Sequence, residues 1–195
     1  MKAFLFFLFY CLAFYQSNAA NWTPEQIKTA STANEISYLT QPERDAIMYI
    51  NLARLYPKQF VQIELLKYEA PKKYGNYLQN STFKKSLINQ LNRQNALPAY
   101  VYDERLYADA KCYANEMGNS GEIGHKRQNC KENNFAECCS YGMETGLDIA
   151  MQWLIDHDVP SCGHRDICLD KNYTKIAINI HAHKKWEVCA VAEFI

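Results

Sequence analysis

Residues 175–194 read KIAINIHAHKKWEVCAVAEF, and this stretch decides the fold class. Apolar side chains occupy every second position in both of its halves, at Ile176, Ile178 and Ile180 and then at Trp186, Val188, Ala190, Ala192 and Phe194. A period of two is typical of β-strands, and only a short polar segment separates the two runs. The stretch therefore predicts two strands joined by a short loop at the end of the chain.

Upstream of this hairpin the apolar residues recur every three or four positions, which predicts helices. We expect four of them: one from Thr40 to Pro57, one over residues 81–95, one from Asp103 to Gly118 and one over residues 147–154. Helices followed by a hairpin are typical of an α+β domain. The more specific prediction is an α/β/α sandwich, in which helices cover a small sheet.

The first residues of the chain have the pattern of a secretory signal peptide. Residues 1–19 read MKAFLFFLFYCLAFYQSNA, with a charged start, an apolar run and small residues before the expected cleavage after Ala19. A transmembrane anchor is the alternative, but the apolar run is shorter than the roughly 20 residues that span a bilayer. We therefore expect a secreted, extracellular protein without a transmembrane anchor.

The rest of the chain is expected to hold one domain. Residues 20–39 are polar without a clear period and are predicted to form a poorly ordered leader, followed by a domain over residues 40–195. Lys and Arg number 21, as do Asp and Glu. A balanced charge gives no net field toward nucleic acid, so this class of partner is not expected.

Secretion makes disulfides the default state of the cysteines. Cleavage after Ala19 would remove one of the eight cysteines and leave an odd number, so one thiol would lack an intramolecular partner. We expect a local bridge between Cys162 and Cys168, and a bridge from Cys130 to Cys138 or Cys139. A zinc cluster is the alternative, but the sequence contains no CxxC pair to support it.

Polar residues that could carry chemistry gather at predicted loops and helix ends. They are His125, Glu137, Asp156, Asp158 and His164. If these loops converge, two imidazoles and one or two carboxylates could hold a divalent metal such as zinc. The same groups could equally form a hydrogen-bonded network in which each histidine is held by an acid. Spacing alone leaves both alternatives open.

Four other polar residues have simpler interpretations. His157 is expected to be an exposed residue at a helix end. Arg165 is expected to brace a loop or to pair with a carboxylate. His181 and His183 would share one strand face, but two ligands leave most of a zinc shell unfilled.

Four stretches, in this order along the chain, resemble the CAP superfamily, also called the SCP/TAPS domain (cysteine-rich secretory protein, antigen 5, pathogenesis-related 1). They are ERDAIMYINLARLYPKQF at 43–60, LPAYVYDERLYADAKCYANEM at 97–117, Gly124-His125, and MQWLIDHDVPSCGHRDICL at 151–169. The resemblance covers roughly residues 40–195. It is closer to the bacterial-type "G-H-R" branch, because the "G-H-Y-T-Q-V-V-W" signature of animal and plant members is absent.

The resemblance implies a central cleft lined by two histidines and two acids. By position these are His125 and His164, which would be the metal ligands, and Glu137, which matches the glutamate of the family's "G-E-N" motif. The second acid is Asp156, one turn after the tryptophan of the fourth stretch, with Asp158 as the alternative. An aspartate is shorter than the glutamate that the family often has there, which puts its reach to a shared metal in doubt.

The favoured function is a secreted binding or interaction module without catalysis, whose cleft holds a metal (zinc), a lipid, a peptide or a protein. A protease-like hydrolase is the first alternative, with His125 or His164 as general base. An extracellular lipid or sterol binder is the second. It would need an apolar groove beside residues 67–80, a predicted loop whose lysines are expected to form a solvated surface.

Overall fold

The computed structural model describes residues 21–195, so the expected signal peptide at residues 1–19 lies outside the described part of the chain. The helices are α1 (Pro24–Ala30), α2 (Gln41–Leu55), α3 (Pro57–Phe60), the π-helix η1 (Val61–Leu65), the 3-10 helix η2 (Lys72–Tyr74), α4 (Thr82–Arg93), α5 (Glu104–Ser120), α6 (Gly146–Ile155) and α7 (Gly163–Cys168). The strands are β1 (Val101–Tyr102), β2 (Ala136–Tyr141), β3 (Lys175–His183) and β4 (Glu187–Phe194).

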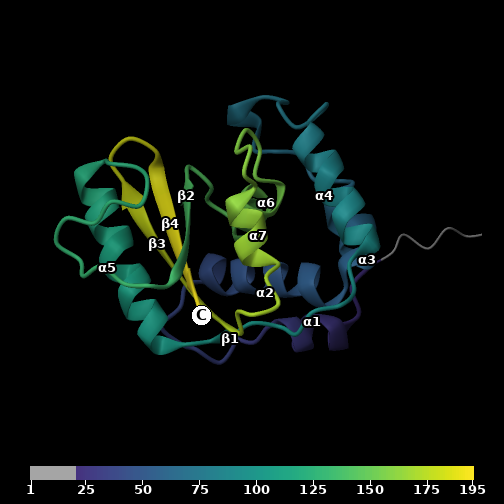
Figure 1. Cartoon of the computed structure of the whole chain (residues 1–195), viewed down its shortest axis with the longest axis horizontal. Helices are drawn as coiled ribbons and strands as arrows, with labels where there is room; N and C mark the ends of the chain where they lie inside the picture. The colour runs from purple at the N-terminus through teal and green to yellow at the C-terminus, as the bar shows by residue number, and fades with distance from the viewer. Residues whose placement is uncertain (1–20) are drawn as a thin grey trace, which may run out of the picture.

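The architecture is a small mixed sheet between layers of helices. Helix α5 packs against β3 and β4 on one face, and α2, α6 and α7 pack on the other face, as Figure 1 shows. The strand order is β1-β3-β4-β2, with β1 parallel to β3 and the other pairs antiparallel. The α+β prediction and the C-terminal hairpin are confirmed.

Strand β2 is one of the elements that the sequence did not reveal. Its residues, AECCSY, have no clear apolar alternation, because the strand is covered on both faces and paired only along β4. The pairing places Glu137 directly opposite Glu193. Two acids therefore share one face of the sheet, where they need a cation or a proton between them.

The prediction of a poorly ordered leader is wrong for residues 21–39. Thr23 begins α1 with a capping box, in which its side chain accepts from Gln26 N and Gln26 reaches back to its backbone N–H. Ala30 is fully buried, and the Asn51 side chain of α2 donates to its carbonyl oxygen at 2.9 Å. Trp22 donates to Glu64 Oε1 at 2.7 Å. A helix of seven residues is too short to show a period, so the sequence pattern missed it.

Helix α5 runs past Gly118, where we expected it to stop. It ends at Gly121, whose φ of 76° is the left-handed conformation that favours glycine. Gly118 serves a different purpose, because a Cβ there would lie 2.1 Å from the carbonyl oxygen of Ala182. The missing side chain lets α5 approach β3 closely.

Both predicted disulfides are wrong. The one disulfide among residues 21–195 joins Cys112 to Cys130. Cys162 and Cys168 lie at opposite ends of α7, six residues apart. Six helical residues span about 9 Å, which exceeds the roughly 7 Å that a disulfide can bridge between Cα atoms. Cys138 and Cys139 are instead buried in β2 as free thiols.

Candidate ligand-binding cleft

Two histidine–carboxylate pairs lie side by side where β2, α6 and α7 meet. His125 Nδ1 lies 2.7 Å from Glu137 Oε1, and His164 Nδ1 lies 2.7 Å from Asp156 Oδ1. The centroids of the two imidazole rings are 6.4 Å apart. Each Nδ1 is engaged by a carboxylate, so Nε2 is the atom that each ring has left for a ligand. The structure thus brings together four residues that lie up to 39 positions apart in the sequence.

The pair of Asp156 and His164 is built locally. Asp156 caps the C-terminus of α6 with a left-handed φ of 54°, and its side chain is buried. Its second oxygen accepts the backbone N–H groups of His164 and Arg165, at 2.9 and 3.3 Å, at the start of α7. The aspartate therefore reaches His164 despite its short side chain. Asp158 is 85% exposed and lies 3.5 Å from His157 instead, so of the two candidates Asp156 is the one beside His164.

The pair of Glu137 and His125 depends on a buried arginine. Arg127 Nη2 lies 2.5 Å from Glu137 Oε2, 2.5 Å from Glu193 Oε1 and 3.0 Å from Asp109 Oδ2. The Arg127 side chain is only 4% exposed. By holding Oε2 of Glu137, the guanidinium leaves Oε1 of the same carboxylate to His125. Arg127 was not predicted, because a single arginine in a polar loop carries no sequence signal.

One cation among three carboxylates shifts the pKa values around it. Burial, hydrogen bonding to Asp109 and the nearby charge of Glu137 raise the pKa of Glu193 well above its ordinary value, which favours its protonated form. Burial alone would raise the pKa of Glu137, but hydrogen bonds from His125 and Glu193 and the charge of Arg127 lower it. The hydrogen bond to Glu137 in turn raises the pKa of His125. Glu137 is thus the ionised acceptor for His125.

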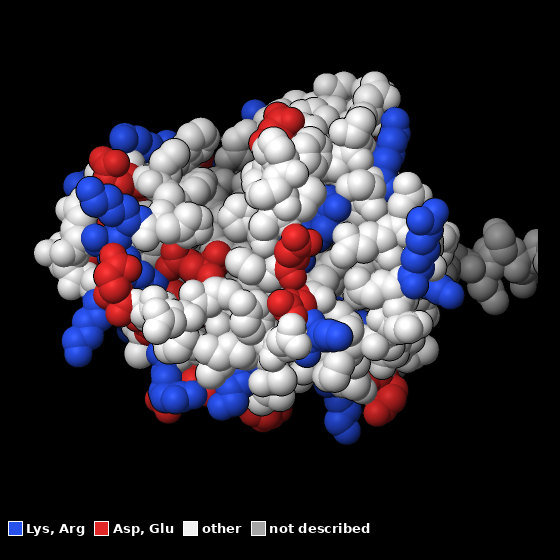
Figure 2. Space-filling model, viewed as in Figure 1, with Lys and Arg blue, Asp and Glu red and all other residues white. Residues whose placement is uncertain are grey.

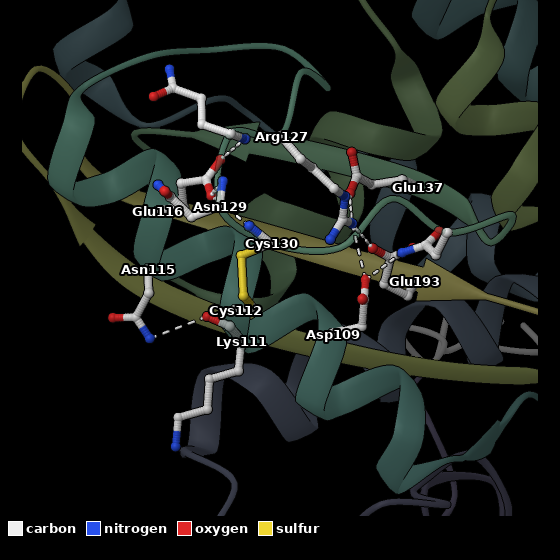
Figure 3. The surroundings of a disulfide bond; sticks show 12 residues. Asp109, Lys111, Cys112, Asn115, Glu116, Arg127, Asn129, Cys130, Glu137 and Glu193 are labelled. Atoms are coloured by element: carbon white, nitrogen blue, oxygen red, sulfur yellow. Dashed lines mark hydrogen bonds and ion pairs between the residues drawn. A yellow bond between two sulfur atoms is a disulfide. The ribbon is translucent and has the colours of Figure 1, made fainter.

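The disulfide holds the loop that carries His125. Cys112 on α5 is bonded to Cys130 in the 121–135 loop, as Figure 3 shows. The carboxylate of Glu116, one turn further along α5, accepts three successive backbone N–H groups at 2.6, 2.6 and 2.9 Å, those of Gln128, Asn129 and Cys130. These contacts fix the loop to α5. The position of His125 therefore depends on contacts far from the cleft.

A cavity of about 650 Å³ opens beside the two histidines. Its lining is mostly aromatic and aliphatic and includes Tyr68, Tyr74, Tyr77, Leu78, Tyr141, Met151, Trp153 and Trp186. His125, Asp156 and His164 line the same cavity. The 67–80 segment supplies its tyrosine-rich wall, so the cleft combines a polar end with an apolar body.

Cys139 adds a sulfur to the polar end. Its Sγ lies 3.8 Å from His125 Nδ1 and 3.7 Å from Glu137 Oε1, and the ligand atoms of these three residues lie within 4.8 Å of one another. Burial raises the pKa of the Cys139 thiol well above its usual range. The donor chemistry fits a zinc-like ion, because imidazole, carboxylate and sulfur are its usual ligands and a bound metal displaces the thiol proton. The expected bridge from Cys130 to Cys138 or Cys139 is not formed, and Cys139 is a free thiol.

The remaining predicted residues have structural contacts. Arg165 donates to the carbonyl oxygens of Leu154 and Ile155, so its predicted bracing role is confirmed. His157 is half-buried rather than exposed and lines the cavity. His183 is buried, and its two ring nitrogens are engaged by the carbonyl oxygen of Glu122 and by the backbone N–H groups of Lys185 and Trp186, so neither nitrogen is free to bind a metal beside the half-buried His181.

Comparison with known protein families identifies this chain. The family model described as CAP, the cysteine-rich secretory protein family, matches residues 85–194, which is more than half of the chain and contains all four cleft residues. No curated protein matches the chain. Among the described residues no helix has the length and apolar character needed to cross a membrane. The relation to the bacterial-type branch stays a prediction. The chain belongs to the CAP family of cysteine-rich secretory proteins.

Proposed function

We propose that this protein is a secreted, non-catalytic binding module whose cleft holds a small, largely apolar ligand with its polar end at His125 and His164. The observation that carries the proposal is the 650 Å³ cavity, which is lined mainly by aromatic and aliphatic side chains and ends at the two histidines. Ligand sites of small molecules have this size and this mixture of apolar lining and few polar groups. Of the functions considered, this geometry favours an extracellular lipid-like ligand over a peptide or protein.

The apolar wall would supply most of the affinity. A ligand that buries about 250 Å² of apolar surface gains roughly 6 kcal/mol before the cost of association. A neutral hydrogen bond to one imidazole adds only about 1 kcal/mol. The histidines would therefore orient the ligand, while the tyrosine-rich segment at 67–80 would hold it.

A divalent metal fits the polar end of the same cleft. In metal sites an imidazole commonly donates its second N–H to a carboxylate, which fixes the ring and strengthens the ligand. His125 with Glu137 and His164 with Asp156 both have this arrangement. Two ligand sets are available to the metal: the Nε2 atoms of His125 and His164, or His125 with Glu137 and Cys139. In either set a bound zinc ion would supply a Lewis-acidic contact for an anionic or carbonyl group of the ligand.

The contacts in the cleft give less support to a hydrolase. The nearest thiol to a cleft histidine is Cys139, but Glu137 already occupies His125 Nδ1, and burial keeps the thiol protonated. A protonated thiol is a poor nucleophile. Among the described residues no serine hydroxyl is hydrogen-bonded to His125 or His164. Turnover of an ester or peptide that is lost in His125→Ala or His164→Ala, without loss of folding, would contradict the non-catalytic proposal.

The binding proposal can be tested with the neutral fluorescent probe N-phenyl-1-naphthylamine. We expect the disulfide-intact protein to bind the probe, and Tyr77→Ala to weaken binding about threefold or more, because Tyr77 lines the cavity. Tyr38→Ala is the matched control, since Tyr38 is a 50% exposed tyrosine that does not line it. Absence of binding, or an equal loss in both variants, would overturn the proposal.

A further inference from the structure

A second cavity, of about 770 Å³, adjoins the cleft. Tyr68 and Leu78 line both cavities, so the 67–80 segment forms part of the wall of each. The second cavity is bounded on its other side by the first turns of α4. Its lining differs sharply from that of the cleft, because it is rich in lysine.

Four lysines and one acid line this cavity: Lys67, Lys72, Lys84, Lys85 and Glu69. The chain as a whole carries equal numbers of positive and negative side chains, so this excess of positive charge is local. Figure 2 shows mostly Lys and Arg along the side of the molecule that α4 occupies. We define these five residues and the space between them as the basic pocket.

The lysines of the basic pocket lack ion-pair partners. Within residues 21–195 none of the four lies within 4.0 Å of a carboxylate oxygen. Lys73, the neighbour of Lys72, is different, because its Nζ lies 2.7 Å from Glu144 and 2.6 Å from Glu187. Glu69 offsets one of the four positive charges, and the remaining excess of positive charge favours the entry of an anion.

Lys84 is held at a fixed position in this pocket. It is half-buried, and its Nζ donates to the carbonyl oxygen of Tyr68 at 2.7 Å. An ammonium group has two further protons to donate, so this anchored cation can bind an acceptor in the pocket. Lys84 and Lys85 also fall in the first turn of α4, which contains no acidic residue. Cations are unfavourable at a helix N-terminus, and a bound anion would compensate them.

The two cavities are also linked by a hydrogen bond between a residue of each. Oγ of Ser81, which lines the second cavity, lies 2.8 Å from Nδ1 of His157, which lines the cleft. A ligand with an anionic group in the basic pocket would therefore lie close to the apolar cavity.

We infer that the basic pocket binds an oxyanion, a phosphate or sulfate group, at Lys67, Lys72, Lys84 and Lys85. The group could be carried by a free phosphate compound or by the headgroup of a lipid whose chains lie in the cleft. The inference of an oxyanion site depends only on the four lysines and their cavity. Only the lipid source rests on the proposed function of the cleft.

The test is a calorimetric titration of the disulfide-intact protein with sodium pyrophosphate at low salt. We expect saturable binding that is weakened at least fivefold in Lys67→Gln/Lys84→Gln. The control Lys28→Gln/Lys58→Gln removes the same charge from two exposed lysines outside the pocket and should stay within twofold of the parent protein. No binding, or an equal loss in both double variants, would overturn the site.

A second double variant and a second ligand complete the titration experiment. Lys67→Gln/Lys72→Gln changes only exposed side chains, so it tests the pocket even if loss of the Lys84 contact destabilises the fold, and it should also weaken binding severalfold. Dihexanoylphosphatidic acid identifies the source. Tighter binding than pyrophosphate that also falls in Tyr77→Ala would assign a lipid headgroup, whereas indifference to Tyr77→Ala would assign a free phosphate and remove support from the lipid-like ligand of the cleft.

Discussion

The two histidine–carboxylate pairs of the cleft have the same hydrogen-bond geometry but different support. Asp156 and His164 are eight residues apart, and the start of α7 fixes the carboxylate through backbone N–H groups. Glu137 and His125 meet through β2, the 121–135 loop, Arg127 and the disulfide. One half of the site is therefore local, and the other half depends on long-range contacts. Changes far from the cleft should affect the two halves unequally.

The largest effect is expected from removing the cation that supports the long-range half. Arg127→Met would leave Glu137, Glu193 and Asp109 without their shared partner. Breaking a buried ion pair on one side costs about 3–5 kcal/mol, and we expect that loss in the free energy of unfolding measured in urea. Arg105→Met should cost less than about 1 kcal/mol, because Arg105 is a 72% exposed guanidinium beside Asp103. Similar losses in both variants would contradict the role of Arg127.

The next effect is expected from the disulfide. Cys112→Ser/Cys130→Ser opens a loop with a sequence separation of 18 residues. The chain-entropy relation gives a loss of about 3 kcal/mol for a loop of this size. Thermal unfolding should show that loss, and probe binding in the cleft should weaken because the loop carries His125. Unchanged probe binding would show that the disulfide does not position the cleft.

A smaller effect is expected in the local half. Asp156→Asn keeps a residue that tolerates the left-handed conformation but removes the carboxylate that holds His164. Loss of such a support weakens metal binding about 10- to 100-fold, which calorimetric titration with zinc chloride would measure. Asp158→Asn is the matched control, because Asp158 is exposed and does not contact His164. Equal zinc affinities in the two variants would argue against the metal site.

The smallest effect concerns pH. The hydrogen bond to Glu137 raises the pKa of His125 in the folded protein. This stabilisation is fully present below the unfolded pKa of about 6.5 and is lost as the pH rises through the folded value. Glu137→Gln should remove it, so the fall in unfolding free energy over this pH range should be shallower in the variant. An identical pH dependence in both proteins would rule out the pair as its source.

The sequence predicts the local features of this molecule better than the long-range ones. The apolar alternation that begins at Ile176 predicts the hairpin. His125 and His164 lie in stretches that resemble the family, which made them candidate cleft residues. The sequence could not reveal Arg127, because its importance arises only when β2 and β4 pair and bring Glu137 opposite Glu193. Disulfide partners were missed for the same reason, since they depend on which elements pack together.

The apolar cavity, too, could not be predicted from the sequence. Tyr77 and Trp186 lie more than 100 positions apart and come together only after the 67–80 segment packs near the β3–β4 turn. The lysines of the same segment look like a solvated surface in the sequence, yet Lys67 and Lys72 line one concave site in the fold. Clusters of this kind follow from topology rather than from local composition.

The most direct test of unequal support is an NMR titration of the histidine side chains in the parent protein and in Cys112→Ser/Cys130→Ser. Our account predicts that the pKa of His125 falls toward its ordinary value in the variant, because the loop no longer holds the ring against Glu137. The His164 ring signals should keep their positions, because Asp156 and α7 are untouched. Equal changes at both histidines, or a change at His164 alone, would contradict the account.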